Sequence, residues 1–245
     1  MFGRLYSRFT TWLGVPSNAA IRKWCWDWDL AQTNDQEIWA SEPDLARFRS
    51  ARALRDSDPA AALAEFQALV QQGSIWSMME VGYCLWKGRG TDVDRDQAEQ
   101  WYGAASQNGC QRALLEYIMI LLNRGDLDQA EAALGPAVAD DWAPALYWQA
   151  SIRMRRAKVR ETMSQVLPLL ERAAEKGSRY AQWTLAKEMS WGRFGLDKVP
   201  EGHRLLGRFS GAALADLTEK AVTDSETDED SAGPWSTAEG APTLH

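Results

Sequence analysis

Residues 77–109 read SMMEVGYCLWKGRGTDVDRDQAEQWYGAASQNG, and this stretch decides the fold. Apolar residues at helical spacing fill its first part, a glycine-bearing loop follows at 88–96, and helical spacing resumes before Gly109. Apolar residues three and four positions apart are typical of an amphipathic helix. Glycine readily adopts the left-handed conformation that ends a helix. The stretch therefore predicts a hairpin of two helices.

The same hairpin recurs along the chain. Four glycines are expected to end helical patterns: Gly73, Gly109, Gly177 and Gly211, with 36 residues between the first two and 34 between the last two. A small residue stands near the start of each first helix: Ser77, Ala113, Ala145 and Ala181, at spacings of 36, 32 and 36. The period leaves one glycine missing, near 140–141. Two independent markers that share a period indicate tandem repeats, which are stabilised by stacking on their neighbours.

This register gives four helical hairpins, and a degenerate hairpin precedes them. PAAALAEFQALVQQG at 59–73 matches the second helix of a unit, and PDLARFRSARAL at 43–54 supplies an irregular first helix. Strand-like alternation does not persist anywhere in the sequence. The closest case, WCWDWD at 24–29, reads equally well as a helical stripe. The sequence therefore predicts an all-α fold.

At this point the chain resembles the Sel-one-like repeat family, a relative of the tetratricopeptide repeat. The family pattern is AxxxLGxxYxxGxGVxxDxxKAxxWYxxAAxxG, and the first unit matches it at Ser77, Val81, Gly82, Leu85, Gly88, Gly90, Asp94, Ala98, Trp101, Tyr102, Ala104, Ala105 and Gly109. The fourth unit keeps Ala181, Leu185, Ala186, Met189 and Gly192, and the third keeps Ala173, Ala174 and Gly177. The resemblance covers roughly 44–211.

The resemblance implies a right-handed solenoid of antiparallel helix pairs that serves protein–protein interaction. The departures from the family pattern lie mainly in the second helices. Pro136 and Pro168 fall inside those of the second and third units, and Pro200 and Gly202 follow the first helix of the fourth. Since proline removes a helical hydrogen bond, these helices are expected to be less regular.

Three segments are predicted from composition and pattern. Residues 1–42 form a Trp-rich helical extension, residues 43–215 the repeats, and residues 216–245 an acidic tail. The tail carries eight acidic residues and one lysine. A segment so rich in charge and poor in apolar residues is expected to be disordered.

Composition excludes several classes of function. The net charge of −7 argues against broad nucleic-acid binding. Three cysteines without a CxxC spacing, and two histidines, offer neither a disulfide scaffold nor a four-ligand zinc site. The sequence contains no nucleophile-elbow, zinc-protease, P-loop or dinucleotide motif. We therefore expect no enzyme activity, no metal and no cofactor, and the unpaired cysteines with no export signal favour a cytoplasmic location.

A partner-binding face is predicted from the first helices. Counting each small residue as position zero, positions 2, 6 and 9 point away from the packing set of the family. Most of these positions are apolar or aromatic, and ten residues form the candidate concave face: Met79, Tyr83, Trp86, Leu115, Met119, Leu122, Tyr147, Met154, Trp183 and Lys187. Aromatic residues and methionine suit a groove that receives a peptide or a helix. Two alternatives remain open: the first helices are apolar on all sides, or residues 1–42 fold back into the groove.

The extreme N-terminus offers a second surface. Phe2, Leu5, Phe9, Trp12 and Leu13 fall on one helical face, with arginines beside them. One interpretation is an interfacial helix on an anionic membrane, and the other is a helix packed on the rest of the fold. A liposome experiment with and without residues 1–14 separates the two.

Three hypotheses of function follow. The first is a non-enzymatic adaptor that binds a protein partner, as a peptide or helix, on the concave face. The second is a scaffold at the membrane periphery, held there by residues 1–14. The third is a non-catalytic subunit that positions an enzyme. The sequence leaves the partner and the oligomeric state open.

Overall fold

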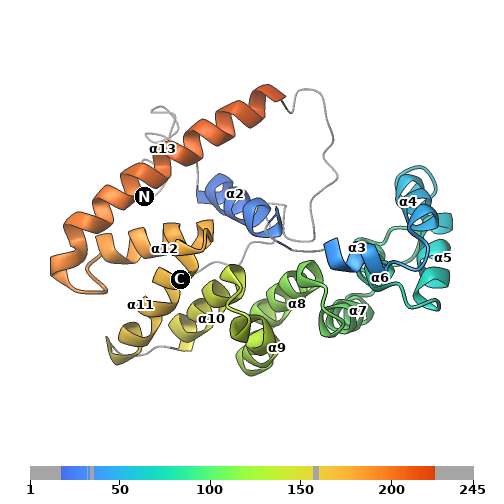
Figure 1. Cartoon of the computed structure of the whole chain (residues 1–245), viewed down its shortest axis with the longest axis horizontal. Coiled ribbons are helices and arrows are strands. Elements are labelled where there is room, and N and C mark those ends of the chain that lie inside the picture. The colour runs from blue at the N-terminus through green and yellow to red at the C-terminus, as the bar shows by residue number, and fades with distance from the viewer. Residues whose placement is uncertain (1–17, 32, 34–35, 157–159, 224–245) are drawn as a thin grey trace. The chain divides into compact units, whose positions relative to one another are not determined.

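The computed structural model describes residues 18–31, 33, 36–156 and 160–223 (Figure 1). These residues form twelve α-helices, α2 to α13, and one short 3₁₀ helix, η1, with no strand among them. Successive helices pack as adjacent pairs from α4 to α8 and from α10 to α13. The predicted all-α repeat fold is therefore confirmed.

The chain divides into two compact units. We call the first the α4–α8 unit; it spans residues 32–133. Its helices are α3 (Gln36–Ser41), α4 (Leu45–Leu54), α5 (Pro59–Val70), α6 (Ile75–Lys87), α7 (Arg95–Gln107), α8 (Gln111–Arg124) and the first half of α9 (Leu127–Ala139). The degenerate hairpin expected at 43–73 is thus a helix pair, α4 and α5.

We call the second the α10–α13 unit; its described parts lie within residues 18–31 and 134–223. Its helices are α2 (Asn18–Ala31), the end of α9, α10 (Ala143–Arg156), α11 (Arg160–Glu175), α12 (Arg179–Ser190), η1 (Leu196–Lys198) and α13 (Val199–Thr223). Helix α2 packs against α12 and α13, although more than 100 residues separate them in the sequence. Figure 1 shows α2 between α13 and the pair α10 and α12.

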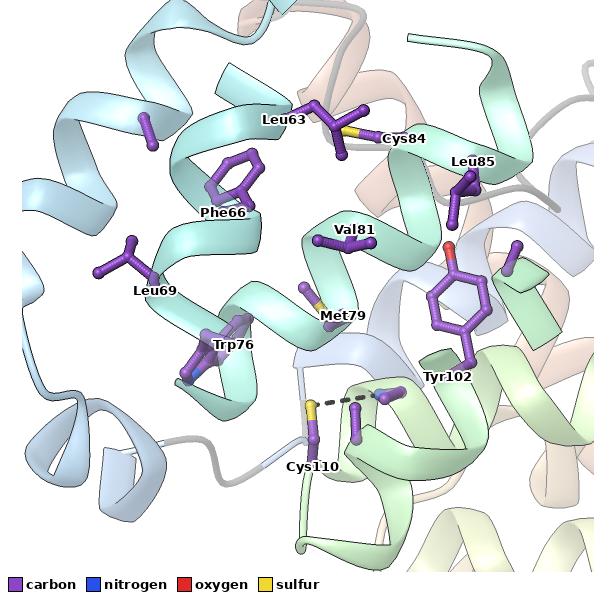
Figure 2. Packing of buried hydrophobic residues seen from close by; sticks show 14 of the residues in the cluster. Leu63, Phe66, Leu69, Trp76, Met79, Val81, Cys84, Leu85, Tyr102 and Cys110 are labelled. Carbon is purple, nitrogen blue, oxygen red and sulfur yellow. Dashed lines mark hydrogen bonds between the residues drawn. The ribbon is translucent and has the colours of Figure 1, made fainter. Parts of the chain in front are cut away.

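Aromatic and aliphatic side chains fill the core of the α4–α8 unit (Figure 2). The Phe48 and Phe66 rings lie 5.8 Å apart, between α4 and α5, and the Phe48 ring lies 6.3 Å from that of Trp76 on α6. Tyr102, which the family pattern places in the second helix, is almost fully buried. The helices bury these side chains against one another, so each helix depends on its neighbours for stability.

The helix caps recur at the period of the repeats. Three first helices begin with a polar side chain that accepts a hydrogen bond from the backbone N–H three residues on, which is the geometry of an N-cap. The pairs are Ser74 Oγ with Ser77 N at 3.0 Å, Cys110 Sγ with Ala113 N at 3.4 Å, and Ser178 Oγ with Ala181 N at 3.2 Å. The residue before each cap is Gly73, Gly109 or Gly177, with φ of +92°, +92° and +97°.

The glycine missing from the end of the second unit is replaced by an aspartate in the same conformation. Asp141 has φ of +58°, and no other non-glycine residue in the described ranges has a positive φ. It lies 32 residues after Gly109 and 36 before Gly177, as the period requires. Asp and Asn tolerate this left-handed conformation better than other residues with a side chain. The register predicted near 140–141 is therefore confirmed.

Helix α13 corrects two expectations. Gly211 was expected to end a helix, yet it lies inside α13, which is continuous over 25 residues. Pro200 does not interrupt the helix because it falls in the first turn, where no helical hydrogen bond needs its nitrogen. Pro136 and Pro168 also lie inside helices, α9 and α11.

None of the helices among the described residues is both long and apolar enough to cross a membrane.

Candidate protein-interaction surface

The predicted face of the α4–α8 unit is largely buried. Its buried members are Met79, Tyr83, Leu115, Met119 and Leu122, with exposed fractions between 0% and 9%. Trp86, at the end of α6, remains half-buried. These helices are therefore apolar on more than one side, as one of the two alternatives foresaw. The accessible part of this predicted set in this unit is the ring of Trp86.

Guanidinium groups cover the aromatic rings of α6. The Arg55 and Arg89 guanidinium carbons lie 5.1 and 5.7 Å from the Tyr83 ring centre, and Arg95 lies 5.4 Å from that of Trp86. A cation over an aromatic face is attracted by the ring quadrupole, by about 0.5–1 kcal/mol at an exposed site. The edge of this unit is therefore aromatic and cationic together.

Two glutamates at equivalent repeat positions are buried in this unit. Glu80, almost fully buried, pairs with Arg52 at 3.2 Å and Arg55 at 3.5 Å. Glu116 occupies the same repeat position on α8 and is also buried, near Arg112 and Lys87. Burial outweighs those two cations and raises the pKa of Glu116 to about 8. One glutamate is thus held by arginines, while the other is favoured as a neutral acid.

The predicted face of the α10–α13 unit is also mostly buried. Tyr147 and Trp183 are 0% and 6% exposed, whereas Met154 and Lys187 are half-buried. The Lys187 ammonium lies 5.0 Å from the Trp183 ring centre and 5.1 Å from that of Trp191, which is 61% exposed. Lys187 therefore bridges a buried and an exposed tryptophan.

Helix α2 covers the first-helix side of this unit. Trp24 packs edge-on against Phe209 of α13, with ring centres 5.1 Å apart, and its Nε1–H donates to Asp216 at 3.1 Å. The Arg179 guanidinium lies 3.8 Å over the Trp24 ring and pairs with Asp216 at 2.8 Å. One tryptophan thus joins α2 to both α12 and α13.

Three further aromatic residues, Tyr147, Trp148 and Tyr180, form what we call the aromatic wall. The Tyr147 and Tyr180 rings stack at 5.0 Å, and Trp148 lies 4.9 and 5.5 Å from these two rings. Trp26 of α2 packs edge-on against Trp148, with ring centres 6.5 Å apart. The Tyr180 hydroxyl donates to the carbonyl of Arg22 at 3.0 Å. The wall therefore binds α2 by aromatic packing and by one hydrogen bond to its backbone.

Several buried polar groups at the interface between α2 and the rest of its unit lack hydrogen-bond partners among the described residues. Asp29 is fully buried, and neither carboxyl oxygen makes a hydrogen bond of normal geometry to any described residue, although the Ser178 hydroxyl is close enough to favour the ionised form. The indole N–H groups of Trp26 and Trp148 also lack an acceptor among these residues. Each such buried group costs about 1–3 kcal/mol.

Burial also sets the protonation of the groups around α2. It raises the pKa of Asp29 well above its usual value, against the smaller opposing effects of Ser178 and Arg179. It likewise raises the pKa of the Cys25 thiol, and the Asp29 charge adds to this effect. Both groups are therefore favoured in their neutral forms, and Cys25 is not an activated nucleophile.

The sequence prediction missed most of the residues that bind α2. Of the aromatic wall and Arg179 it named only Tyr147. Trp148, Arg179 and Tyr180 lie outside positions 2, 6 and 9, from which the face was predicted. A signal was present, because Trp76 and Tyr180 both directly precede the small residue of their unit. Trp76 packs against Trp39 of α3, with ring centres 4.8 Å apart. Tyr180, at the equivalent position, contacts α2 through its hydrogen bond to Arg22.

Within the described ranges, no group of three or more His, Cys, Asp or Glu side chains lies close enough together to hold a metal ion. Cys25, Cys84 and Cys110 are buried thiols without a disulfide. The membrane face predicted from Phe2, Leu5, Phe9, Trp12 and Leu13 lies outside the described residues and stays a prediction.

Comparison with solved structures identifies the fold as a Sel1-like helical repeat. The chain is similar to a Sel1 repeat protein from Oxalobacter formigenes, known from a crystal structure, with a TM-score of 0.57 and 17% sequence identity. The match covers 69% of this chain and 74% of that chain. No model of a protein family matches the sequence, and a search of curated proteins gives no match. The resemblance to Sel-one-like repeats is thus confirmed for the fold, and at this identity for the fold alone.

Proposed function

We propose that this protein is a non-enzymatic interaction scaffold that binds a helix or peptide of a protein partner along its first helices. One observation carries the proposal. The α10–α13 unit binds a helix on that side, its own α2, through aromatic rings contributed by α10, α12 and α13. Helical-repeat folds of this kind commonly mediate protein interactions and usually do not catalyse reactions.

The half-buried members of the predicted face support an interaction surface in each unit, taken separately. In the α4–α8 unit, Trp86 presents an aromatic ring beside the positive charge of Arg95. In the α10–α13 unit, Lys187 presents its positive charge beside the exposed ring of Trp191, and Met154 is a flexible apolar side chain. Each of these surfaces favours a partner segment that is apolar on one side and acidic at its margin. We place the protein in the cytoplasm as part of the same proposal.

The test is capture of partners by chemical crosslinking in cells of the source organism, followed by mass spectrometry. We expect Trp86→Ala to remove specific partners, because aromatic residues dominate binding energy at protein interfaces. Val93→Ala is the control, an exposed apolar residue of the same unit that lies outside the predicted face. Circular dichroism verifies that both variants keep their helix content. Identical partners for the wild type and Trp86→Ala would remove the predicted face from the function.

A further inference from the structure

Two large apolar side chains lie exposed together where α12 is joined to α13. Trp191 is 61% exposed and Leu196 is 81% exposed. A Cβ on Gly192 would lie 3.1 Å from Leu196 Cδ2, so the leucine side chain lies over the residue that follows Trp191. The two side chains therefore form one exposed apolar surface.

Positive charge lies beside this surface. The Lys187 ammonium and the Arg193 guanidinium carbon lie 5.1 and 5.4 Å from the Trp191 ring centre. Glu188 pairs with both cations, at 3.5 and 2.9 Å, so these three groups together keep one positive charge. We call Lys187, Trp191, Arg193 and Leu196 the α12–α13 corner. It suits a segment that brings an apolar side chain together with acidic groups.

Helix α13 extends the positive surface away from the corner. Arg204 and Arg208 lie one turn apart on this helix, and both are exposed. Neither forms an ion pair with another residue that the structure describes. Because like charges at this spacing repel each other, an acidic segment along this face would relieve the repulsion.

Net charge indicates which part of the chain could supply that segment. Residues 18–31 and 134–223 carry 16 Arg and Lys and 12 Asp and Glu, a net charge of +4, whereas residues 32–133 carry 9 and 16, a net charge of −7. Residues 224–245, which lie outside the described residues, carry six acidic residues, no Arg or Lys, and Trp235. Their charge is attracted by the α10–α13 unit and repelled by the α4–α8 unit.

The lengths of α13 and of this segment agree. Helix α13 begins directly after η1, at the corner, and its 25 residues make it about 37 Å long. The twelve residues 224–235 span at most about 40 Å when extended, so a return along α13 brings Trp235 to the corner. Residues 228–230, which are all acidic, then lie about 17–24 Å from the end of α13, level with Arg208 at about 22 Å.

We propose that residues 224–235 return antiparallel along α13, with their acidic residues against Arg204 and Arg208 and with Trp235 on the α12–α13 corner. The segment is then an internal ligand of the surface around Trp191, and a partner that binds there must displace it. Only this consequence for a partner rests on the proposed function. The contact itself needs no partner and does not involve Trp86.

Disulfide trapping in the full-length chain tests the proposal. The three native cysteines are each 0% exposed, so cysteines introduced at the surface react with one another. The test pair is Ser236→Cys with Asp197→Cys, an exposed position next to Leu196. The matched control is Ser236→Cys with Asp92→Cys, an exposed aspartate of the α4–α8 unit. In a glutathione redox buffer, the effective concentration of the test pair should exceed that of the control by about tenfold or more.

Further substitutions in the test pair identify the contacts. Trp191→Ser and Trp235→Ala should each lower the effective concentration by about threefold or more, because each removes one aromatic side chain of the contact. Arg208→Glu should lower it as well, because it places an acid against the acidic residues. Arg49→Glu, at an exposed position of α4, makes the same change of charge and should leave the value unchanged.

Three results would overturn the proposal. The first is an equal effective concentration for the test and control pairs, and the second is a gain that survives both Trp191→Ser and Arg208→Glu. The third is a disulfide between two chains, seen as a dimer on a non-reducing gel, which would make a second copy the occupant. Loss of captured partners in Trp86→Ala would stand in all three cases, so the proposed function and this inference fail separately.

Discussion

Individual residues hold the repeat register through backbone conformation rather than through side-chain contacts. Gly73, Gly109 and Gly177 have positive φ, and an added Cβ would meet nothing within 4 Å at any of them. The need for glycine there is purely conformational. Asp141 meets the same need at the fourth site, where its carboxylate also pairs with Arg172 and Lys176.

Gly177→Ala should therefore destabilise the protein by about 1–2 kcal/mol, the cost of the left-handed conformation for a residue with a Cβ. Gly211→Ala is the matched control, because a Cβ there also meets nothing, and the residue lies inside α13. Alanine should stabilise a helix interior by roughly 0.5–1 kcal/mol. Urea unfolding of both variants measures the difference. Equal effects of the same sign would contradict a conformational role for Gly177.

Glu116 makes stability depend on pH. Its pKa is raised from an ordinary 4.5 to about 8 in the folded protein, chiefly by burial. The folded state therefore keeps a proton that the unfolded state releases between these values, so stability falls as pH rises through that window. The slope reaches about 1.4 kcal/mol per pH unit.

Glu116→Gln removes this titration. Relative to the wild type, the variant should gain stability between pH 5 and pH 8, by a few kcal/mol in total, and the difference should level off above pH 8. Thermal or urea unfolding across that range measures it. Glu175→Gln, at an exposed position, should follow the wild-type profile. A difference between Glu116→Gln and the wild type that is the same at pH 5 and pH 8 would show that Glu116 does not titrate in this window.

At the scale of elements, the contact between α12 and α13 depends on a glycine that looked like an irregularity in the sequence. A Cβ at Gly202 would lie 2.3 Å from the backbone nitrogen of Ser190 and 2.7 Å from the carbonyl carbon of Met189. Backbone atoms move only with their helix. Gly202 is thus the point at which α13 approaches α12.

Gly202→Ala should push the two helices apart and destabilise the protein by roughly 1–3 kcal/mol, the usual cost of overpacking. Gly207→Ala lies in the same helix, where a Cβ meets nothing within 4 Å, and should stabilise instead. The melting temperatures of the two variants should therefore shift in opposite directions. Equal shifts would mean that α13 packs less closely on α12 than the structure shows.

At the scale of the whole chain, the repeats continue through a division into two compact units. The division falls between residues 133 and 134, inside α9, and the period of small residues runs across it. Periodicity in the sequence indicates repeats, but it does not indicate where the contacts between neighbouring repeats become sparse. The segmentation into residues 1–42, 43–215 and 216–245 remains a prediction, except that α13 continues to Thr223, so residues 216–223 are helical and do not belong to a disordered tail. Within the described part of residues 1–42, α2 packs in one unit and α3 in the other.

The candidate site was predictable only in part. The sequence left open whether positions such as Met79 and Trp183 are apolar for packing or for binding a partner, and both residues are buried. It could not choose between these reasons, because burial depends on which distant segment packs there. Whether Trp86, Met154 and Lys187 contact a partner stays a prediction. The residues that bind α2 were mostly missed, since their partners lie in another part of the chain.

The sequence by itself determined the helices, their caps and the repeat register, because these depend on residues within about one turn or one hairpin of each other. Only the tertiary structure decided that α2 covers the aromatic wall. The contact between Trp26 and Trp148 joins residues 122 apart, and no local pattern encodes it. Contacts between repeats recur and can be predicted from the spacing of residues in the sequence. A single long-range contact occurs once and depends on how two folded surfaces pack together.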